Sequence, residues 1–170
     1  MADLVDLVVE DPRWEAAGLA ALAEQAGRAA LAAAGRDPDL HEIALLACDD
    51  ARIAALNGEF RGKPVPTNVL SWPAFGAVVP EPEQDEPIFL GDLALGYDTC
   101  AREAEEAGIA LADHAAHLVV HGILHLIGHD HGDDAEAEAM EALEARVLAR
   151  LGIADPYSGR GLTPSAGRPA

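Results

Sequence analysis

The chain is short of basic residues, aromatic residues and cysteine. Its 170 residues include 11 Lys and Arg against 30 Asp and Glu, which gives a net charge of -19 at pH 7. Phosphate contacts need Lys and Arg to displace counterions, so this charge argues against non-specific nucleic-acid binding over the whole surface. Aromatic residues make up only 4% of the chain, and the core must therefore be built mainly from Ala, Leu, Val and Ile.

Cysteine spacing and hydrophobic runs exclude several further classes. Cys48 and Cys100 stand far apart without a Cys-x-x-Cys spacing, which predicts buried thiols rather than a disulfide framework or a Cys-based zinc site. The most apolar stretch, 115–128, is interrupted by histidines and is shorter than the roughly 18 residues of a membrane span. The first six residues carry acids where a signal or transit peptide carries Lys or Arg. We therefore expect no membrane contact and a cytoplasmic location.

One short segment departs from the acidic balance. Lys63, the only lysine, lies two residues from Arg61, and no acid occurs between Phe60 and Pro80. This segment predicts one local positive surface on an otherwise acidic protein.

The chain length predicts a single domain, and its apolar pattern predicts four strands and five helices. Period-2 or continuous apolar runs indicate strands, and runs with helical spacing between capping residues and glycines indicate helices. The predicted strands are 4–9, 43–48, 69–72 and 88–95, and the predicted helices are 13–34, 50–60, 98–108, 111–128 and 133–151. Asp98 and Thr99 are expected to cap the helix over 98–108. The domain is expected to span 1–154, and Pro, Gly, Ser and Arg in 155–170 predict a disordered tail.

Histidines are concentrated near the end of the helix expected over 111–128. His121 and His125 are four residues apart, so their imidazoles project from one helical face. Gly128 allows the chain to leave the helix through a left-handed turn and to bring His131 toward the same point. The spacing predicts a metal site with three histidine ligands.

Three imidazole nitrogens suit one Zn²⁺ per chain, with a fourth position left for water, although nickel, copper and iron also accept such ligands. Asp130 and His117 are expected to support the ligands rather than to bind the metal. His129 can either replace a ligand or face solvent. The same histidine spacing occurs in metalloproteases, but those enzymes carry a Glu base where this chain has Gly122, which argues against peptidase activity.

Acidic residues fill the helix expected over 133–151. They are interpreted as a solvated helix face without a catalytic role: Asp133, Asp134, Glu136, Glu138, Glu141 and Glu144.

These motifs together resemble the YbeY family of bacterial ribosomal-RNA maturation factors, which are single-strand-specific metallo-endoribonucleases. The resemblance covers most of the chain apart from its two ends. Its matching segments are 57–63, 66–72, 90–92, 121–131 and 151–157, and His129 stands where the family pattern has Tyr.

The resemblance implies an α+β fold with a small mixed four-stranded sheet packed with about five helices, and a zinc held by His121, His125 and His131. It also implies maturation of the 3′ end of 16S rRNA with ribosome quality control in the cytoplasm. The implied partners are single-stranded RNA, the ribosomal subunit and ribosomal proteins. Arg61 is the expected catalytic residue, because a guanidinium can hold a phosphate through two hydrogen bonds. The further expected RNA contacts are Lys63, Asn68 and Ser71.

Several alternatives remain open at this stage. The nucleophile is either the ribose 2′-hydroxyl or a metal-bound water. The chain could instead be a ribosome-associated assembly factor with a mainly structural metal, which a fourth protein ligand such as His117 or His129 would favour. It could also be a zinc hydrolase of another substrate. The oligomeric state is not predicted.

Overall fold

A four-stranded mixed sheet forms the centre of the computed structural model, which describes residues 3–76, 78–83, 86–129 and 132–157. The strand order is β1-β2-β4-β3, with β1, β2 and β4 parallel and β3 antiparallel to β4. The strands are β1 (Val5–Val9), β2 (His41–Cys48), β3 (Val69–Pro73) and β4 (Ile88–Gly96). The predicted α+β class and mixed four-stranded sheet are confirmed.

Six α-helices occur within the described ranges, where the sequence predicted about five. They are α1 (Arg13–Ala16), α2 (Leu19–Ala33), α3 (Asp50–Arg61), α4 (Tyr97–Ala107), α5 (Leu111–Leu126) and α6 (Asp134–Arg150), with a short 3-10 helix, η1 (Pro38–Leu40), before β2. The single helix predicted over 13–34 is wrong. It is divided because Gly18 adopts a left-handed backbone with φ of 74°, a conformation that glycine adopts at little cost.

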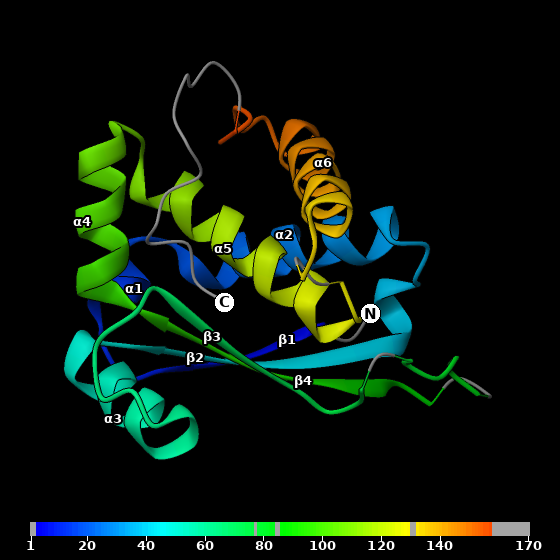
Figure 1. Cartoon of the computed structure of the whole chain (residues 1–170), viewed down its shortest axis with the longest axis horizontal. Helices are drawn as coiled ribbons and strands as arrows, with labels where there is room; N and C mark the ends of the chain where they lie inside the picture. Colours follow the sequence, from blue (N-terminus) through cyan, green and yellow to red (C-terminus); the bar gives the residue numbers. More distant parts are fainter. Residues whose placement is uncertain (1–2, 77, 84–85, 130–131, 158–170) are drawn as a thin grey trace.

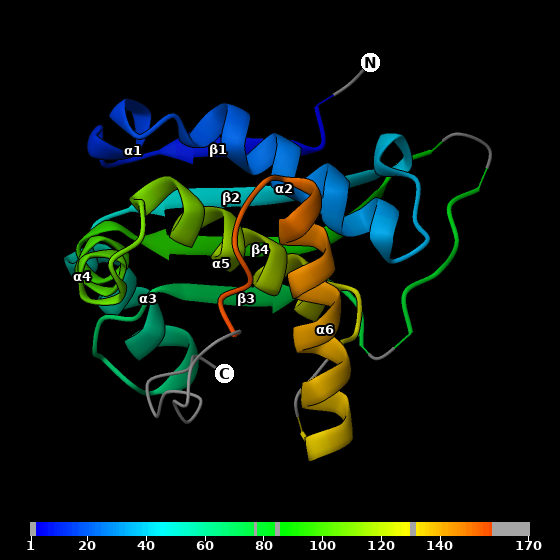
Figure 2. The same ribbon diagram turned by 90° about the horizontal axis from the view of Figure 1, so that it is seen from above.

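The helices cover the two faces of the sheet unequally. Figures 1 and 2 show α2, α5 and α6 over one face and α3 against the other. Between the first layer and the sheet lies the main core, which includes Leu45, Leu93 and Ile123, each no more than 2% exposed. On the α3 side, Ile53 packs against Cys48 and Ala94 in a smaller cluster.

Helix α5 packs closely against the sheet at Gly122. A Cβ atom on Gly122 would lie 2.7 Å from Cδ2 of Leu93 on β4, closer than two carbon atoms can pack. Any larger residue at this position would therefore require the Leu93 side chain to shift.

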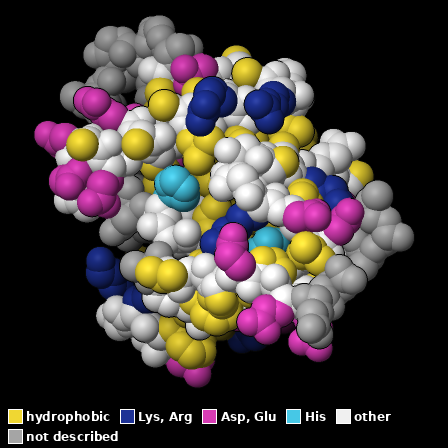
Figure 3. Space-filling model, turned by 90° about the vertical axis from the view of Figure 1, so that its right-hand side faces the viewer, with side chains coloured by type: hydrophobic (Ala, Val, Ile, Leu, Met, Phe, Trp, Pro, Cys, Tyr) yellow, Lys and Arg dark blue, Asp and Glu magenta, His cyan; other side chains and the backbone are white. Residues whose placement is uncertain are grey.

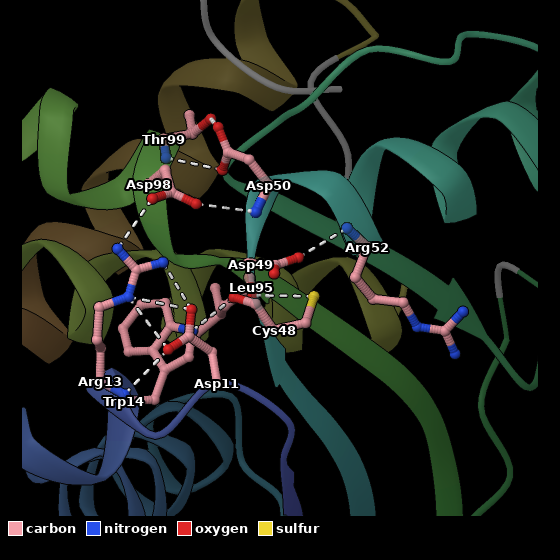
Figure 4. A network of polar contacts seen from close by, with 10 residues as sticks. All are labelled: Asp11, Arg13, Trp14, Cys48, Asp49, Asp50, Arg52, Leu95, Asp98 and Thr99. Atoms are coloured by element: carbon pink, nitrogen blue, oxygen red, sulfur yellow. Dashed lines mark hydrogen bonds and ion pairs between the residues drawn. The ribbon is translucent and has the colours of Figure 1, made fainter.

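The starts of α3 and α4 are joined by a network of polar contacts (Figure 4). Because β2 and β4 are parallel neighbours, the helices that follow them begin side by side. The Asp50 carboxylate accepts hydrogen bonds from the Thr99 backbone N–H (2.9 Å) and the Thr99 hydroxyl (2.8 Å), and Asp98 accepts from the Asp50 backbone N–H (3.1 Å). The predicted cap by Asp98 and Thr99 is wrong: Gly96 holds the N-cap position, and Asp50 of α3 supplies the carboxylate.

Both cysteines are buried and free, as predicted. Burial in apolar surroundings raises the pKa of the Cys48 thiol to about 12 and also raises the pKa of Cys100. Both side chains are therefore protonated packing groups at neutral pH.

Among the described residues, no single helix is both long and apolar enough to cross a membrane. Only α4 and α5 taken together meet that length and composition, and they are bent by 115° relative to each other.

Replacing Asp50 by Ala tests the junction between α3 and α4. The variant loses the acceptor for two Thr99 donors, so we expect the free energy of unfolding to fall by about 1–2 kcal/mol, as for loss of a helix cap. Chemical denaturation measures this change. Glu106→Ala, an exposed acid near the other end of α4, is the control and should change stability by less than about 0.5 kcal/mol. Equal values for the two variants would contradict the assignment.

Candidate metal centre and its surroundings

The two histidines at the end of α5 converge as the sequence predicts. The Nε2 atoms of His121 and His125 are 3.1 Å apart, and their rings meet edge to face. Two nitrogens bound tetrahedrally to one zinc at about 2.0–2.1 Å lie about 3.3 Å apart. His121 is buried and His125 is partly exposed, so the pair stands between the core and the surface. The geometry suits two ligands of a single metal ion.

The chain reverses direction directly after this pair. Gly128 has a φ of 101°, and the His129 backbone N–H donates to the Leu124 carbonyl at 2.9 Å, which closes the end of α5. The predicted left-handed exit at Gly128 is confirmed. The predicted ligand His131 and its neighbour Asp130 lie outside the described residues, and within the described part no three His, Cys, Asp or Glu side chains are grouped to hold a metal ion. The third ligand stays a prediction.

Glu144 is part of this site, contrary to the solvated position expected for it. It comes from α6, is 0% exposed, and its Oε2 lies 2.9 Å from Nδ1 of His121. The sequence does contain a signal for this burial, because Glu144 falls in the helical stripe of buried apolar residues formed by Met140, Val147 and Leu148. A carboxylate within an apolar stripe needs partners, and the histidines of α5 provide them.

The other oxygen of Glu144 binds two further groups. Its Oε1 lies 2.7 Å from Nε2 of His117 and accepts a hydrogen bond from the Tyr157 hydroxyl at 2.6 Å. His117 thus contacts the carboxylate that holds His121 rather than a position beside the His121–His125 pair. Tyr157 belongs to the predicted tail, 155–170. Its first residues, 155–157, run back across α5 (Figure 2), where Tyr157 contacts His117. The rest of the tail, 158–170, lies outside the described residues.

The charge of Glu144 is maintained in this buried position. Burial by itself raises the pKa of the Glu144 carboxyl, but the hydrogen bonds from His117 and His121 outweigh it and hold that pKa well below its usual range. The side chain is therefore a carboxylate, which can only accept hydrogen bonds.

The expected phosphate-binding residues lie at the end of α3. Arg61 is exposed, and its Nη2 donates to the Ser71 carbonyl at 2.8 Å. Ser71 lies on β3, the strand that packs against α5, so this bond fixes Arg61 to an element adjacent to the histidine helix. Lys63 is also exposed and follows the left-handed Gly62 that ends α3. The structure thus connects Arg61, Ser71 and α5 through β3.

Asn68 occupies a different position from the other expected RNA contacts. Its side chain is buried, its Nδ2 donates to Glu103 at 2.9 Å, and its Oδ1 accepts from the Val69 backbone N–H at 2.6 Å. His114 lies 2.8 Å from the same Glu103 oxygen. Asn68 therefore fixes the start of β3 to α4, and its contact with RNA stays a prediction.

Basic side chains do not form one continuous surface on the face drawn in Figure 3. Lys and Arg occur there in small, separate groups among acidic and hydrophobic side chains. Any nucleic acid that approaches this face meets charges of both signs, which favours binding at a limited site rather than along the surface.

Comparison with known proteins supports the fold and shows the family. The family model described as Endoribonuclease YbeY matches residues 9–152. The chain belongs to the YbeY family. The matched range spans Arg61, His121, His125 and the whole of α6.

Individual members of the YbeY family are similar over nearly their whole length. A protein named Endoribonuclease YbeY from Ruegeria pomeroyi is 54% identical over 163 residues, covering 91% of this chain and 98% of the relative. One of the same name from Paracoccus denitrificans is 56% identical over 159 residues, covering 91% and 90%. The solution structure of TM1509 from Thermotoga maritima is 20% identical, with a TM-score of 0.56 over 91% of this chain and 99% of that one, which supports the fold.

The contacts of Glu103 predict a pH dependence of stability. Burial raises the pKa of its carboxyl, but hydrogen bonds from His114 and Asn68 outweigh this effect and lower that pKa below its usual range. Because the folded pKa is the lower one, Glu103 stabilises the protein above the unfolded pKa of about 4.3, and this contribution is lost as the pH falls through the folded value.

Denaturation of the wild type and Glu103→Gln between pH 7 and pH 3 measures this contribution. We expect the variant to be less stable at pH 7 and the difference to shrink as the pH falls. A difference that is constant over this range would contradict the stabilising role of the carboxylate. Glu106→Gln, exposed on the same helix, serves as the control.

Proposed function

We propose that the protein is a metal-dependent endoribonuclease that cleaves single-stranded RNA. The observation that carries the proposal is the convergence of the His121 and His125 Nε2 atoms on α5, next to the strand that anchors Arg61. The names of the YbeY relatives support RNA as the substrate.

His121 and His125, with the predicted ligand His131, would hold one Zn²⁺. The donor set fits, because the Nε2 atoms of the two imidazoles lie 3.1 Å apart and the buried Glu144 carboxylate contacts the other ring nitrogen of His121, Nδ1. When bound, such a metal supplies Lewis acidity toward a phosphate oxygen or lowers the pKa of water. The sequence and geometry leave both the ribose 2′-hydroxyl and water as possible nucleophiles.

Arg61 would hold the phosphate and stabilise charge that develops on it during cleavage. Its guanidinium carries five N–H donors. The hydrogen bond to the Ser71 carbonyl orients the group and leaves other N–H donors for a phosphate. A planar guanidinium can contact two phosphate oxygens at once, and Lys63 adds a second positive charge close by in the chain. These two residues are exposed, as a site that meets a large substrate requires.

The substrate we propose is ribosomal RNA, with the 3′ end of 16S rRNA as the cleaved region. The resemblance to the YbeY family motifs supports this choice. It also supports action on the ribosomal subunit in the cytoplasm and contact with ribosomal proteins. A chain with a net charge of -19 needs such a defined target, because its surface as a whole repels RNA.

Cleavage of a defined single-stranded RNA by the pure protein tests the proposal. We expect His125→Ala to lose bound metal and activity, and Arg61→Ala to keep the metal and the fold while losing about 100- to 1,000-fold in cleavage rate. Arg52→Ala, nine residues earlier on α3, is the matched control and should cleave as the wild type does. All proteins are purified identically so that contaminating nucleases are recognised by equal activity.

Equal activity in the wild type and all three variants, or activity in none of them, would contradict the enzymatic proposal. It would favour the alternative of a ribosome-associated assembly factor whose contact with RNA is not hydrolytic.

A further inference from the structure

Glu144 is the most enclosed charged side chain beside the candidate metal centre. It is 0% exposed, and it reaches α5 from a different helix, α6. Its two oxygens are used differently: Oε2 binds Nδ1 of His121, while Oε1 binds His117 and the hydroxyl of Tyr157. Two histidines of α5 and a tyrosine from the segment after α6 thus fix the plane of the Glu144 carboxylate.

The bond between Glu144 and His121 determines which imidazole nitrogen can bind a metal. A neutral imidazole carries one N–H, on either Nδ1 or Nε2, and the other nitrogen holds a lone pair. Since a carboxylate only accepts hydrogen bonds, the 2.9 Å contact requires the proton to be on Nδ1 of His121. The lone pair is then on Nε2, the atom that lies 3.1 Å from Nε2 of His125.

We propose that Glu144 is a positioning residue of the metal centre, which holds His121 as the Nδ1–H tautomer with its Nε2 lone pair directed toward the point shared with His125. The inference rests on the proposed function only for the presence of the metal. The tautomer and orientation of His121 belong to the protein itself, before any metal or RNA binds.

The burial of Glu144 explains why the orientation of its carboxylate is fixed. A buried carboxylate without partners is strongly unfavourable, so the site is stable only when its donors are in place. His117 on α5 holds Oε1 at 2.7 Å, which keeps Oε2 on His121. The Tyr157 hydroxyl is a second donor to the same Oε1, so the carboxylate keeps one donor there when this hydroxyl is removed.

Nitrogen-15 spectra of the metal-free protein at pH 8 test the tautomer directly. The pH lies above the ordinary histidine pKa of about 6.5, so neutral imidazole is observed. We expect His121 of the wild type to be the Nδ1–H tautomer and Glu144→Gln to show a mixture of both tautomers. An Nε2–H tautomer in the wild type would overturn the proposal, and this result does not depend on the folding of any variant.

Zinc affinity, measured by competition with a chelator, tests the consequence for the metal. We expect Glu144→Gln to bind zinc about 10- to 100-fold more weakly than the wild type, as loss of a carboxylate behind a ligand histidine does. Glu138→Gln makes the same change at an exposed position of α6 and should bind as the wild type does. Unchanged affinity in Glu144→Gln would overturn the positioning role.

Tyr157→Phe separates positioning by the carboxylate from simple packing. It removes one donor to Oε1 but leaves the carboxylate on His121, so we expect the Nδ1–H tautomer and zinc affinity within about threefold of the wild type. A loss as large as that of Glu144→Gln would assign the effect to packing and contradict the proposal. None of these readouts uses RNA, so failure of RNA cleavage is distinguished from failure of the positioning role.

Discussion

The close packing of α5 against the sheet is the constraint on which the site depends. A Cβ atom on Gly122 would lie 2.7 Å from Cδ2 of Leu93 on β4, so any larger residue would require Leu93 to shift. The neighbouring His121 is buried and must satisfy its polar atoms within the protein. Its contacts with Glu144 and His125 meet this requirement.

The buried carboxylate of Glu144 connects this pair to the rest of the fold. It brings a negative charge from α6 into contact with His117 and His121, and it receives Tyr157 from the segment beyond α6. On the other side of the sheet, the bond from Arg61 to the Ser71 carbonyl ties α3 to the edge strand β3. The strand β3 thus contacts both α5, which carries the histidines, and Arg61 of α3, which lies on the opposite face of the sheet.

Apolar periodicity is sufficient to predict the strands and most of the helices, and histidine spacing predicts the converging pair. The mixed sheet follows only from the family resemblance, because periodicity does not give strand order or direction. The failures concern one local backbone conformation and contacts between segments that are distant in the chain. The break at Gly18 depends on a local backbone choice inside an otherwise continuous helical pattern. The cap of α4 comes from Asp50, which periodicity within α4 cannot reveal. Glu144 was placed with its acidic neighbours because composition obscured its position in the buried stripe of α6.

Anomalous diffraction at the zinc absorption edge, from crystals of the zinc-loaded protein, tests the central claim most directly. The account predicts one zinc within about 2.0–2.1 Å of Nε2 of both His121 and His125, with Nδ1 of His121 still on Glu144. A zinc bound elsewhere, or bound directly by Glu144 in place of His121, would contradict it.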